Sequence, residues 1–209
     1  FPIMFSPCSL SMQREANSGI LTEMSLLTIC AATAPTFWVT VIPMLTLPLS
    51  SSSRKKLRYN SLCKDVEFAE LLVDTVACAD WAFFAKNGGD VTSLAVMTAR
   101  AATRRKKIVF FNGYYHGVAP WTQKLDYPGI LEEEVANNIY VDFNDYPALE
   151  KVFTEYKGEI AGLIATPYMH GNFVDNFFPD EGYWQKVRKL CDDHGVVLII
   201  DDVRAGFRL

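Results

Sequence analysis

The sequence predicts an α/β fold, a three-layer sandwich in which a mostly parallel central sheet lies between two layers of helices. Two observations lead to this prediction. From residue 65 onward, short apolar runs typical of strands alternate with longer segments of helical periodicity, and strands separated by helices form βαβ units with parallel pairing. The run Val196–Ile200 is apolar without alternation, which is typical of a central strand buried on both faces.

The first elements expected on this basis lie between residues 65 and 104. Apolar residues recur at helical spacing in Asp65–Ala77, and Trp81–Ala85 is a short apolar strand. A turn at Asn87-Gly88-Gly89 follows the strand. Asp90 is a plausible N-cap for a helix that extends to about Arg104.

The second half of the chain continues the alternation. The segment Glu181–His194 has helical periodicity and is followed by Gly195, a residue that commonly ends a helix. Strands are expected at Lys107–Asn112, Asn138–Asp142 and Ile160–Ala165, and one more helix at Tyr146–Tyr156.

Residues 1–60 show no clear periodicity, and we treat them as a poorly assigned N-terminal segment before a larger domain at residues 61–209. No charged side chain occurs from Ser25 to Ser53, a length that could cross a bilayer. However, Pro35, Pro43 and Pro48 interrupt this segment. We therefore expect no membrane span at 25–53, but an irregular apolar segment that covers part of the core or a partner subunit.

Charge and cysteine content argue against several classes of protein. A net charge of −4 gives no electrostatic basis for binding nucleic acid. The five cysteines are scattered without CxxC spacing and the three histidines are dispersed, so we expect reduced thiols, a cytoplasmic location and no metal site. His170 and His194 are interpreted as surface or helix-end residues without a role.

Three stretches lie at the carboxyl ends of predicted strands, where parallel sheets bind ligands. The first is Asn87-Gly88-Gly89-Asp90. Its glycines let backbone N–H groups approach an anion closely, and the helix that follows adds partial positive charge. A phosphate is therefore a suitable ligand, and an ordinary turn is the alternative.

The other two stretches are Asp201-Asp202 and Gly113–Gly117. A carboxylate after a buried strand loses hydration and needs a partner, for example a protonated ring nitrogen; a metal-binding or merely solvated pair is the alternative. Tyr115 and His116, held between glycines, could stack on a flat ligand, whereas a packing role is the alternative for the tyrosine.

Taken in order, these stretches resemble the class III, fold-type I aminotransferases, which use pyridoxal 5'-phosphate (PLP), and most of all the glutamate-1-semialdehyde aminomutase group. The resemblance extends from about Val66 to Leu209 and implies the large, PLP-binding domain of that fold, incomplete, over residues 61–209. The motifs that carry it are Glu67–Leu72, Ala79-Asp80-Trp81, Lys86–Asp90, Ala99–Thr103, Tyr115-His116-Gly117 and Leu198–Arg208.

The resemblance implies where each end of the cofactor binds. Gly88 and Gly89 match the family's phosphate-binding turn, in which backbone N–H groups hold the PLP phosphate. Asp201 matches the aspartate that pairs with the pyridine nitrogen. The charge of that aspartate keeps the nitrogen protonated, so that the ring accepts electrons from a substrate carbanion.

The resemblance also implies which residues contact the two faces of the pyridine ring. Tyr115 matches the aromatic residue that stacks on the pyridine ring, His116 its neighbour in the same loop, and Val203 the small apolar residue on the opposite face. The sequence departs from the family at four positions. Gly89 stands where Ser or Thr is usual, which removes a hydroxyl contact to phosphate. Asp90 and Asp202 replace a common Glu, and Thr166 stands where many relatives carry Glu.

The family's Schiff-base lysine lies downstream of the aspartate, and no lysine follows Asp201 in this sequence. Because that lysine holds PLP and moves the substrate's α-proton, we expect no catalytic residue here. The prediction is a fragment, inactive alone, of a PLP-dependent aminotransferase or aminomutase that acts on an amino acid or amino-aldehyde and is a homodimer at full length. The alternatives are a non-catalytic protein that keeps the fold as a binding or structural subunit, and a nucleotide-binding domain built on Gly88-Gly89.

Overall fold

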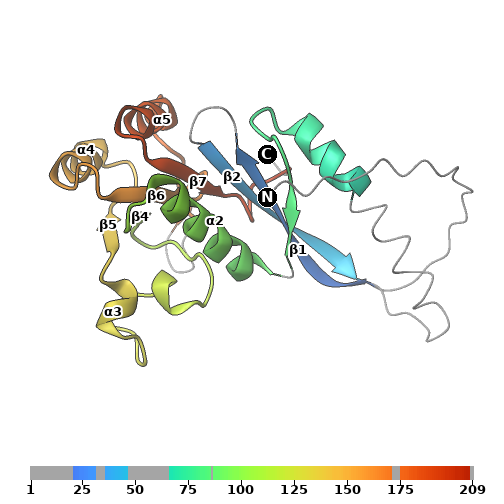
Figure 1. Ribbon diagram of the computed structural model, residues 1–209, viewed down its shortest axis with the longest axis horizontal. Coiled ribbons are helices and arrows are strands. Elements are labelled where there is room, and N and C mark those ends of the chain that lie inside the picture. The colour runs from blue at the N-terminus through green and yellow to red at the C-terminus, as the bar shows by residue number, and fades with distance from the viewer. Residues whose placement is uncertain (1–20, 32–35, 47–65, 86, 171–174, 208–209) are drawn as a thin grey trace, which may run out of the picture.

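The computed structural model describes residues 21–31, 36–46, 66–85, 87–170 and 175–207 (Figure 1). Its centre is a seven-stranded sheet with the strand order β3-β1-β2-β7-β6-β4-β5. Four of these strands are β4 (Lys107–Phe111), β5 (Asn138–Val141), β6 (Ile160–Ala165) and β7 (Val197–Asp201). All four pair in parallel with their neighbours, which confirms the mostly parallel sheet.

The N-terminal part of the chain extends the sheet and corrects one prediction. Residues expected to be irregular form β1 (Leu21–Ala31) and β2 (Thr36–Thr46), which pair with each other antiparallel. β2 also pairs in parallel with β7, but only over Thr36–Val39. Pro43 lies beyond that stretch, so the N–H that proline lacks is not needed by β7. Pro43 therefore does not exclude a strand here, and Pro35 and Pro48 lie outside the described residues.

Because β2 pairs with β7, part of the segment 1–60 belongs to the same sheet as residues 61–209. The predicted strand Trp81–Ala85 is only the two-residue β3 (Phe83–Phe84), which pairs antiparallel with β1. In the described parts of the chain, no helix is long and apolar enough to cross a membrane. Two short elements that the sequence did not predict are η1 (Pro120–Thr122) and α3 (Glu132–Val135).

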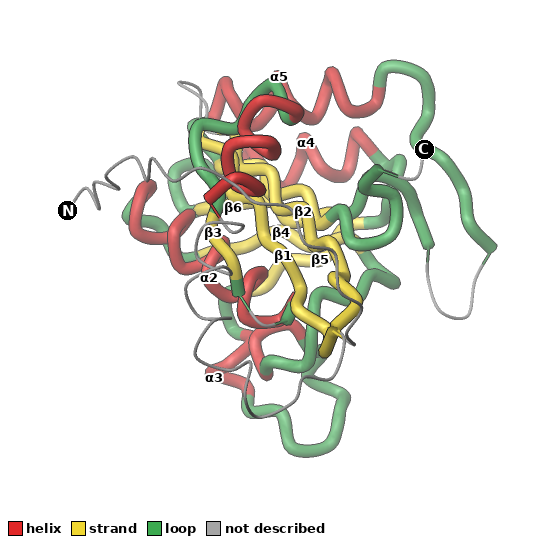
Figure 2. Tube along the Cα trace, turned by 90° about the vertical axis from the view of Figure 1, so that its right-hand side faces the viewer, coloured by secondary structure: helices red, strands yellow, loops and turns green. Residues whose placement is uncertain are grey.

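Helices cover both faces of the sheet, as Figure 2 shows with the strands between α2 and the α4–α5 pair. α2 (Gly88–Thr103) packs through Val91, Ala95 and Ala99 on one face. On the other face lie α4 (Tyr146–Glu155) and α5 (Tyr183–His194). A further helix spans residues 66–75. This arrangement confirms the three-layer prediction.

The apolar run in β7 explains why the sheet needs two helical layers. Val197 and Ile199 belong to the α2 cluster, whereas Leu198 and Ile200 belong to the α4–α5 cluster. All four side chains are buried, so each face of this strand contributes to a core. Successive side chains point to opposite faces of a strand, and a strand buried on both sides therefore shows no polar alternation.

Candidate cofactor site

The N-terminus of α2 presents backbone N–H groups that have no acceptor within the helix. The Oδ1 atom of Asn87 accepts a hydrogen bond from the Asp90 backbone N–H at 2.9 Å, so Asn87 is the N-cap and the prediction of Asp90 was wrong. This hydrogen bond satisfies the backbone N–H of Asp90, the third residue of the helix. The N–H groups of Gly88 and Gly89 have no intrahelical acceptor. The Asp90 carboxylate accepts from Asn87 Nδ2 at 2.7 Å. Gly88 and Gly89 thus lie in the first helical turn, where an anion is favoured.

The loop after β4 comes directly against this helical turn. Gly117 has a φ of +116°, and a Cβ atom on it would lie 3.0 Å from the Cα atom of Gly89. The side chains of its neighbours differ in exposure: His116 is buried, whereas Tyr115 is 56% exposed. Since only glycine adopts this φ without strain and leaves room for Gly89, the loop and the helix approach each other through two glycines.

A buried hydrogen bond connects the same loop to the end of β7. His116 Nδ1 lies 2.8 Å from Asp201 Oδ2, and less than a tenth of either side chain is exposed. The other oxygen, Asp201 Oδ1, and the His116 Nε2 atom are buried and have no hydrogen-bond partner among the described residues. A buried carboxylate oxygen without a donor is costly. The Asp201 carboxylate is therefore suited to receive a proton donor from a ligand.

Asp202 and Val203, which follow Asp201, are partly buried. Val203 is partly buried and packs against the α2 cluster. Burial raises the pKa of the Asp202 carboxyl to about 6, while backbone hydrogen bonds from Ala205 and Gly206 act in the opposite direction. The structure thus brings Gly88, Gly89, His116 and Asp201 into one continuous set of contacts, with Tyr115 in the same loop as His116.

His170 also differs from its prediction. It was expected at the surface or at a helix end, but only 6% of it is exposed, and its ring contacts those of Tyr114 and Tyr168. Burial lowers the pKa of its imidazole, and its backbone oxygen accepts a hydrogen bond from Arg204 at 3.2 Å. The sequence did contain a signal for the burial of His170, because this residue comes shortly after a buried strand. His194 ends α5, as predicted.

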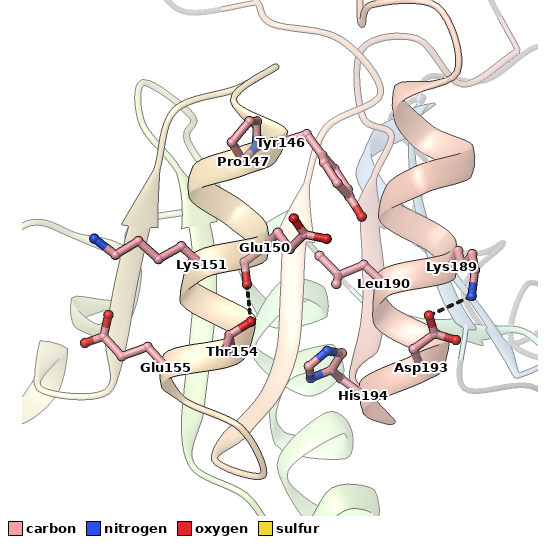
Figure 3. Close-up of a pocket in the computed structure, with 10 residues that line it drawn as sticks. All are labelled: Tyr146, Pro147, Glu150, Lys151, Thr154, Glu155, Lys189, Leu190, Asp193 and His194. Carbon is pink, nitrogen blue, oxygen red and sulfur yellow. Dashed lines mark hydrogen bonds and ion pairs between the residues drawn. The ribbon is translucent and has the colours of Figure 1, made fainter.

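One groove lies outside this site. Figure 3 shows it between α4 and α5, and it contains none of the predicted cofactor-binding residues. Within the described ranges, no three His, Cys, Asp or Glu side chains gather where they could hold a metal ion. The residues that line the groove are Tyr146, Pro147, Glu150, Lys151, Thr154, Glu155, Lys189, Leu190, Asp193 and His194.

The geometry fits a ligand with an anion at one end and a proton-donating ring nitrogen at the other. Free amide N–H groups suit a phosphate, and a buried carboxylate suits a protonated pyridine. A parallel sheet that carries these two anchors at its carboxyl ends defines the class of fold-type I PLP-dependent transferases. Residues 49–208 match the family model of class-III aminotransferases, and the chain belongs to that family.

Individual relatives agree with this assignment. The chain is 42% identical over 144 residues to the aminopentol aminotransferase of Sphingopyxis macrogoltabida, a match that covers 69% of this chain and 34% of the relative. It is 38% identical over 157 residues to the glutamate-1-semialdehyde 2,1-aminomutase of Methanocaldococcus jannaschii, over 70% of this chain and 36% of the relative. The chain therefore spans about a third of the length of these relatives.

Solved structures show the same likeness. The PLP internal aldimine form of the FumI protein from Sphingopyxis sp. MTA144 superimposes with a TM-score of 0.65 and 43% identity, over 68% of this chain and 34% of that protein. A transaminase with PLP bound superimposes with a TM-score of 0.60 and 26% identity, over 66% and 34% of the two chains.

Proposed function

We propose that this chain is the cofactor-binding part of a PLP-dependent aminotransferase or aminomutase. The observation that carries the proposal is the buried Asp201 carboxylate. One of its oxygens pairs with His116 and the other lacks a partner among the described residues. The loop that supplies His116 also lies against the first turn of α2, through Gly117 beside Gly89 and through the Thr92 hydroxyl. Both anchors for PLP are therefore joined through one loop.

The proposed roles follow from these positions. The N–H groups of Gly88 and Gly89 bind the phosphate, and Asp201 Oδ1 accepts a hydrogen bond from the ring nitrogen. His116 holds the carboxylate in place through Nδ1. A negative charge at this point favours the protonated form of the nitrogen. When bound, PLP supplies an electron sink for a substrate carbanion.

The ring faces are assigned to Tyr115 and Val203. The Tyr115 side chain is 56% exposed, which leaves its ring accessible for stacking on a flat ligand. Val203 is partly buried against the α2 cluster and supplies an apolar contact for the other face. A small β-branched side chain at that position fills space without a polar group that would compete for the ring.

The proposed substrate is a small molecule with an amino group, either an amino acid or an amino-aldehyde. Relatives named for amino transfer and for aminomutase activity match the chain at 42% and 38% identity, so both reactions remain candidates. Thr166 is fully buried at the end of β6, and its hydroxyl donates to the Tyr168 backbone oxygen at 2.8 Å. It therefore adds no charge to the site, unlike the glutamate that many family members carry there.

No lysine follows Asp201 in this sequence, and we expect the chain as given to bind the cofactor without turnover. A non-catalytic subunit that keeps the fold is the second candidate, and Gly89 favours it, because it lacks the hydroxyl that the family usually supplies to the phosphate. Completing the chain with the downstream sequence of the same gene separates the two: a lysine there that restores amino transfer supports the enzyme.

We also propose a homodimer and a cytoplasmic location for the full-length protein. Apolar side chains are exposed on the segment that follows β4, and an unpaired apolar surface of this kind favours association. Light scattering of the full-length protein tests the dimer, and a monomer at micromolar concentration would contradict it. The exposed side chains are Tyr115, Val118, Leu125, Tyr127 and Leu131.

Binding of pyridoxamine 5'-phosphate (PMP) tests the proposed function directly, because PMP carries an amine in place of the aldehyde and needs no lysine. We expect the chain to bind PMP in a fluorescence titration. Asp201→Asn removes the charge that faces the ring and lowers the affinity at least about tenfold. The matched control is Asp126→Asn, on an exposed loop residue. Equal binding by both variants, or no binding by the wild type, contradicts the proposal.

A further inference from the structure

The two anchors of the proposed site lie on separate elements. The phosphate anchor is the first turn of α2, and the ring anchor is Asp201 at the end of β7. A ligand of fixed length binds both only when the distance between them is held constant. His116 is the residue that touches both sides, since its side chain pairs with Asp201 and its backbone lies against α2.

Thr92 makes the contact between α2 and the backbone of His116. Only 1% of this residue is exposed. Its hydroxyl oxygen lies 2.7 Å from the His116 backbone oxygen and 3.2 Å from the Gly89 backbone oxygen. A hydroxyl has one proton to donate, and the shorter distance assigns it mainly to His116. The Thr92 side chain thus contacts both the first turn of α2 and the loop whose His116 pairs with Asp201.

The backbone carbonyl of Gly117, the next residue of the loop, is contacted by side chains of residues that follow it in the sequence. The Gly117 backbone oxygen accepts a hydrogen bond from Gln123 Nε2 at 2.9 Å, and the Thr122 hydroxyl oxygen lies 3.0 Å from it but 2.7 Å from the Ala119 backbone oxygen. Thr122 ends η1 and Gln123 follows it. The short stretch His116-Gly117 is therefore fixed by side chains from both flanks, and Thr92 is the donor on the side of the phosphate turn.

We propose that Thr92 is a positioning residue that sets the separation between the phosphate anchor and the Asp201–His116 pair; this inference rests on the proposed function. Loss of the hydroxyl leaves the buried His116 carbonyl without its donor, and a buried unpaired carbonyl is unfavourable. The loop relaxes to recover a partner, and its motion carries the imidazole that pairs with Asp201. The ring anchor then no longer matches a ligand held at the α2 N-terminus.

The experiment compares three variants of the chain for PMP binding. Thr92→Val keeps the shape of the side chain and removes the hydroxyl, whereas Thr92→Ser keeps the hydroxyl. Thr98→Val is the matched control, because the Thr98 hydroxyl also donates to a carbonyl of α2, that of Leu94 at 2.8 Å, but makes no hydrogen bond to the loop. Affinity is measured by fluorescence, and the protonation of the bound ring is followed by its absorbance against pH.

We expect Thr92→Val to weaken PMP binding about tenfold and to shift the ring protonation toward lower pH, while Thr92→Ser and Thr98→Val remain within about twofold of the wild type. Equal affinity in Thr92→Val and the wild type overturns the inference, as does an equal loss in Thr92→Val and Thr98→Val. If Thr92→Val does not fold, a tenfold loss in Thr92→Ser overturns it instead. A wild-type chain that fails to bind PMP overturns the proposed function as well, which separates the two failures.

Discussion

Gly117 is the residue at which backbone conformation and site geometry depend on each other most directly. Its φ of +116° is accessible to glycine alone, and a Cβ atom there would lie 3.0 Å from the Gly89 Cα atom. We expect Gly117→Ala to lower the free energy of unfolding by about 2 kcal/mol or more and to abolish tight PMP binding, because the added methyl group separates the loop from the phosphate turn.

Gly129 provides the control for this variant. It also has a positive φ, of +88°, but nothing lies within 4 Å of a Cβ atom added there. Gly129→Ala therefore carries the backbone strain without the steric clash. Urea denaturation and PMP titration of the two variants separate these contributions. Equal effects of the two substitutions on PMP binding would contradict the close-approach argument.

Asp202 is expected to make stability depend on pH. Burial raises the pKa of its carboxyl from 3.8 to about 6, so the folded chain holds the proton more tightly than the unfolded chain does. Between these two pH values the unfolded state binds fewer protons, and the contribution of Asp202 to stability falls as the pH rises.

The variant Asp202→Asn has no proton to lose and removes this dependence. Because the carboxyl is only about half buried, we expect a modest effect: the variant gains about 1 kcal/mol relative to the wild type between pH 4 and pH 7. Urea denaturation at several pH values measures the difference. A constant difference across this range would show that the carboxyl does not titrate as described.

The site residues were predicted from the rule that ligands bind at the carboxyl ends of strands, and this rule selected Asp201, which ends β7, and His116, in the loop after β4. It did not find Thr92, since a threonine within a helix is an ordinary packing residue until its hydroxyl is seen to meet a loop carbonyl 24 positions away. His170 was misjudged because it stands after Thr166-Pro167, which indicates a turn and no burial.

At the scale of elements, Arg105 joins the end of α2 to the opposite helical layer. Its Nη1 atom donates to the backbone oxygens of Ile160, His194 and Gly195 at 3.1, 2.8 and 3.1 Å. The same guanidinium thus satisfies the start of β6 and the C-terminal end of α5, where helix carbonyls lack intrahelical partners.

We expect Arg105→Met to lower the free energy of unfolding by about 2 kcal/mol, because three carbonyl oxygens lose a charged donor. Arg104→Met is the control, since Arg104 is exposed and ends α2 in the left-handed region, and we expect a change within about 0.5 kcal/mol there. Denaturation by urea gives both values. A loss in the Arg105 variant no larger than in the control would refute this role.

The helices and parallel strands were predictable because each has a strong local pattern. β6 lies at Ile160–Ala165 as predicted, and α5 differs from prediction only in starting at Tyr183 instead of Glu181. β1 and β2 were not, because their residues show neither alternation nor helical spacing, and Pro35, Pro43 and Pro48 suggested irregular structure. The start of α2 was misplaced because Asn87 and Asp90 are both good N-caps.

At the scale of the whole molecule, the order of motifs along the chain carried more information than any one motif. The Gly88-Gly89 turn and Asp201 are separated by more than a hundred residues in sequence. The parallel topology brings both to the carboxyl ends of the strands, and His116 closes the gap between them. Local patterns could predict this common edge, but not the contact between Gly117 of the loop after β4 and Gly89 of the first turn of α2.

Asp201 is proposed to keep the cofactor ring protonated, and nitrogen NMR of bound PMP labelled with 15N in the ring reports that protonation. We predict that the ring nitrogen of PMP bound to the wild-type chain stays protonated well above the pH at which free PMP loses that proton, and that Asp201→Asn abolishes this difference. A ring nitrogen that titrates alike in the wild type and in Asp201→Asn would contradict the account.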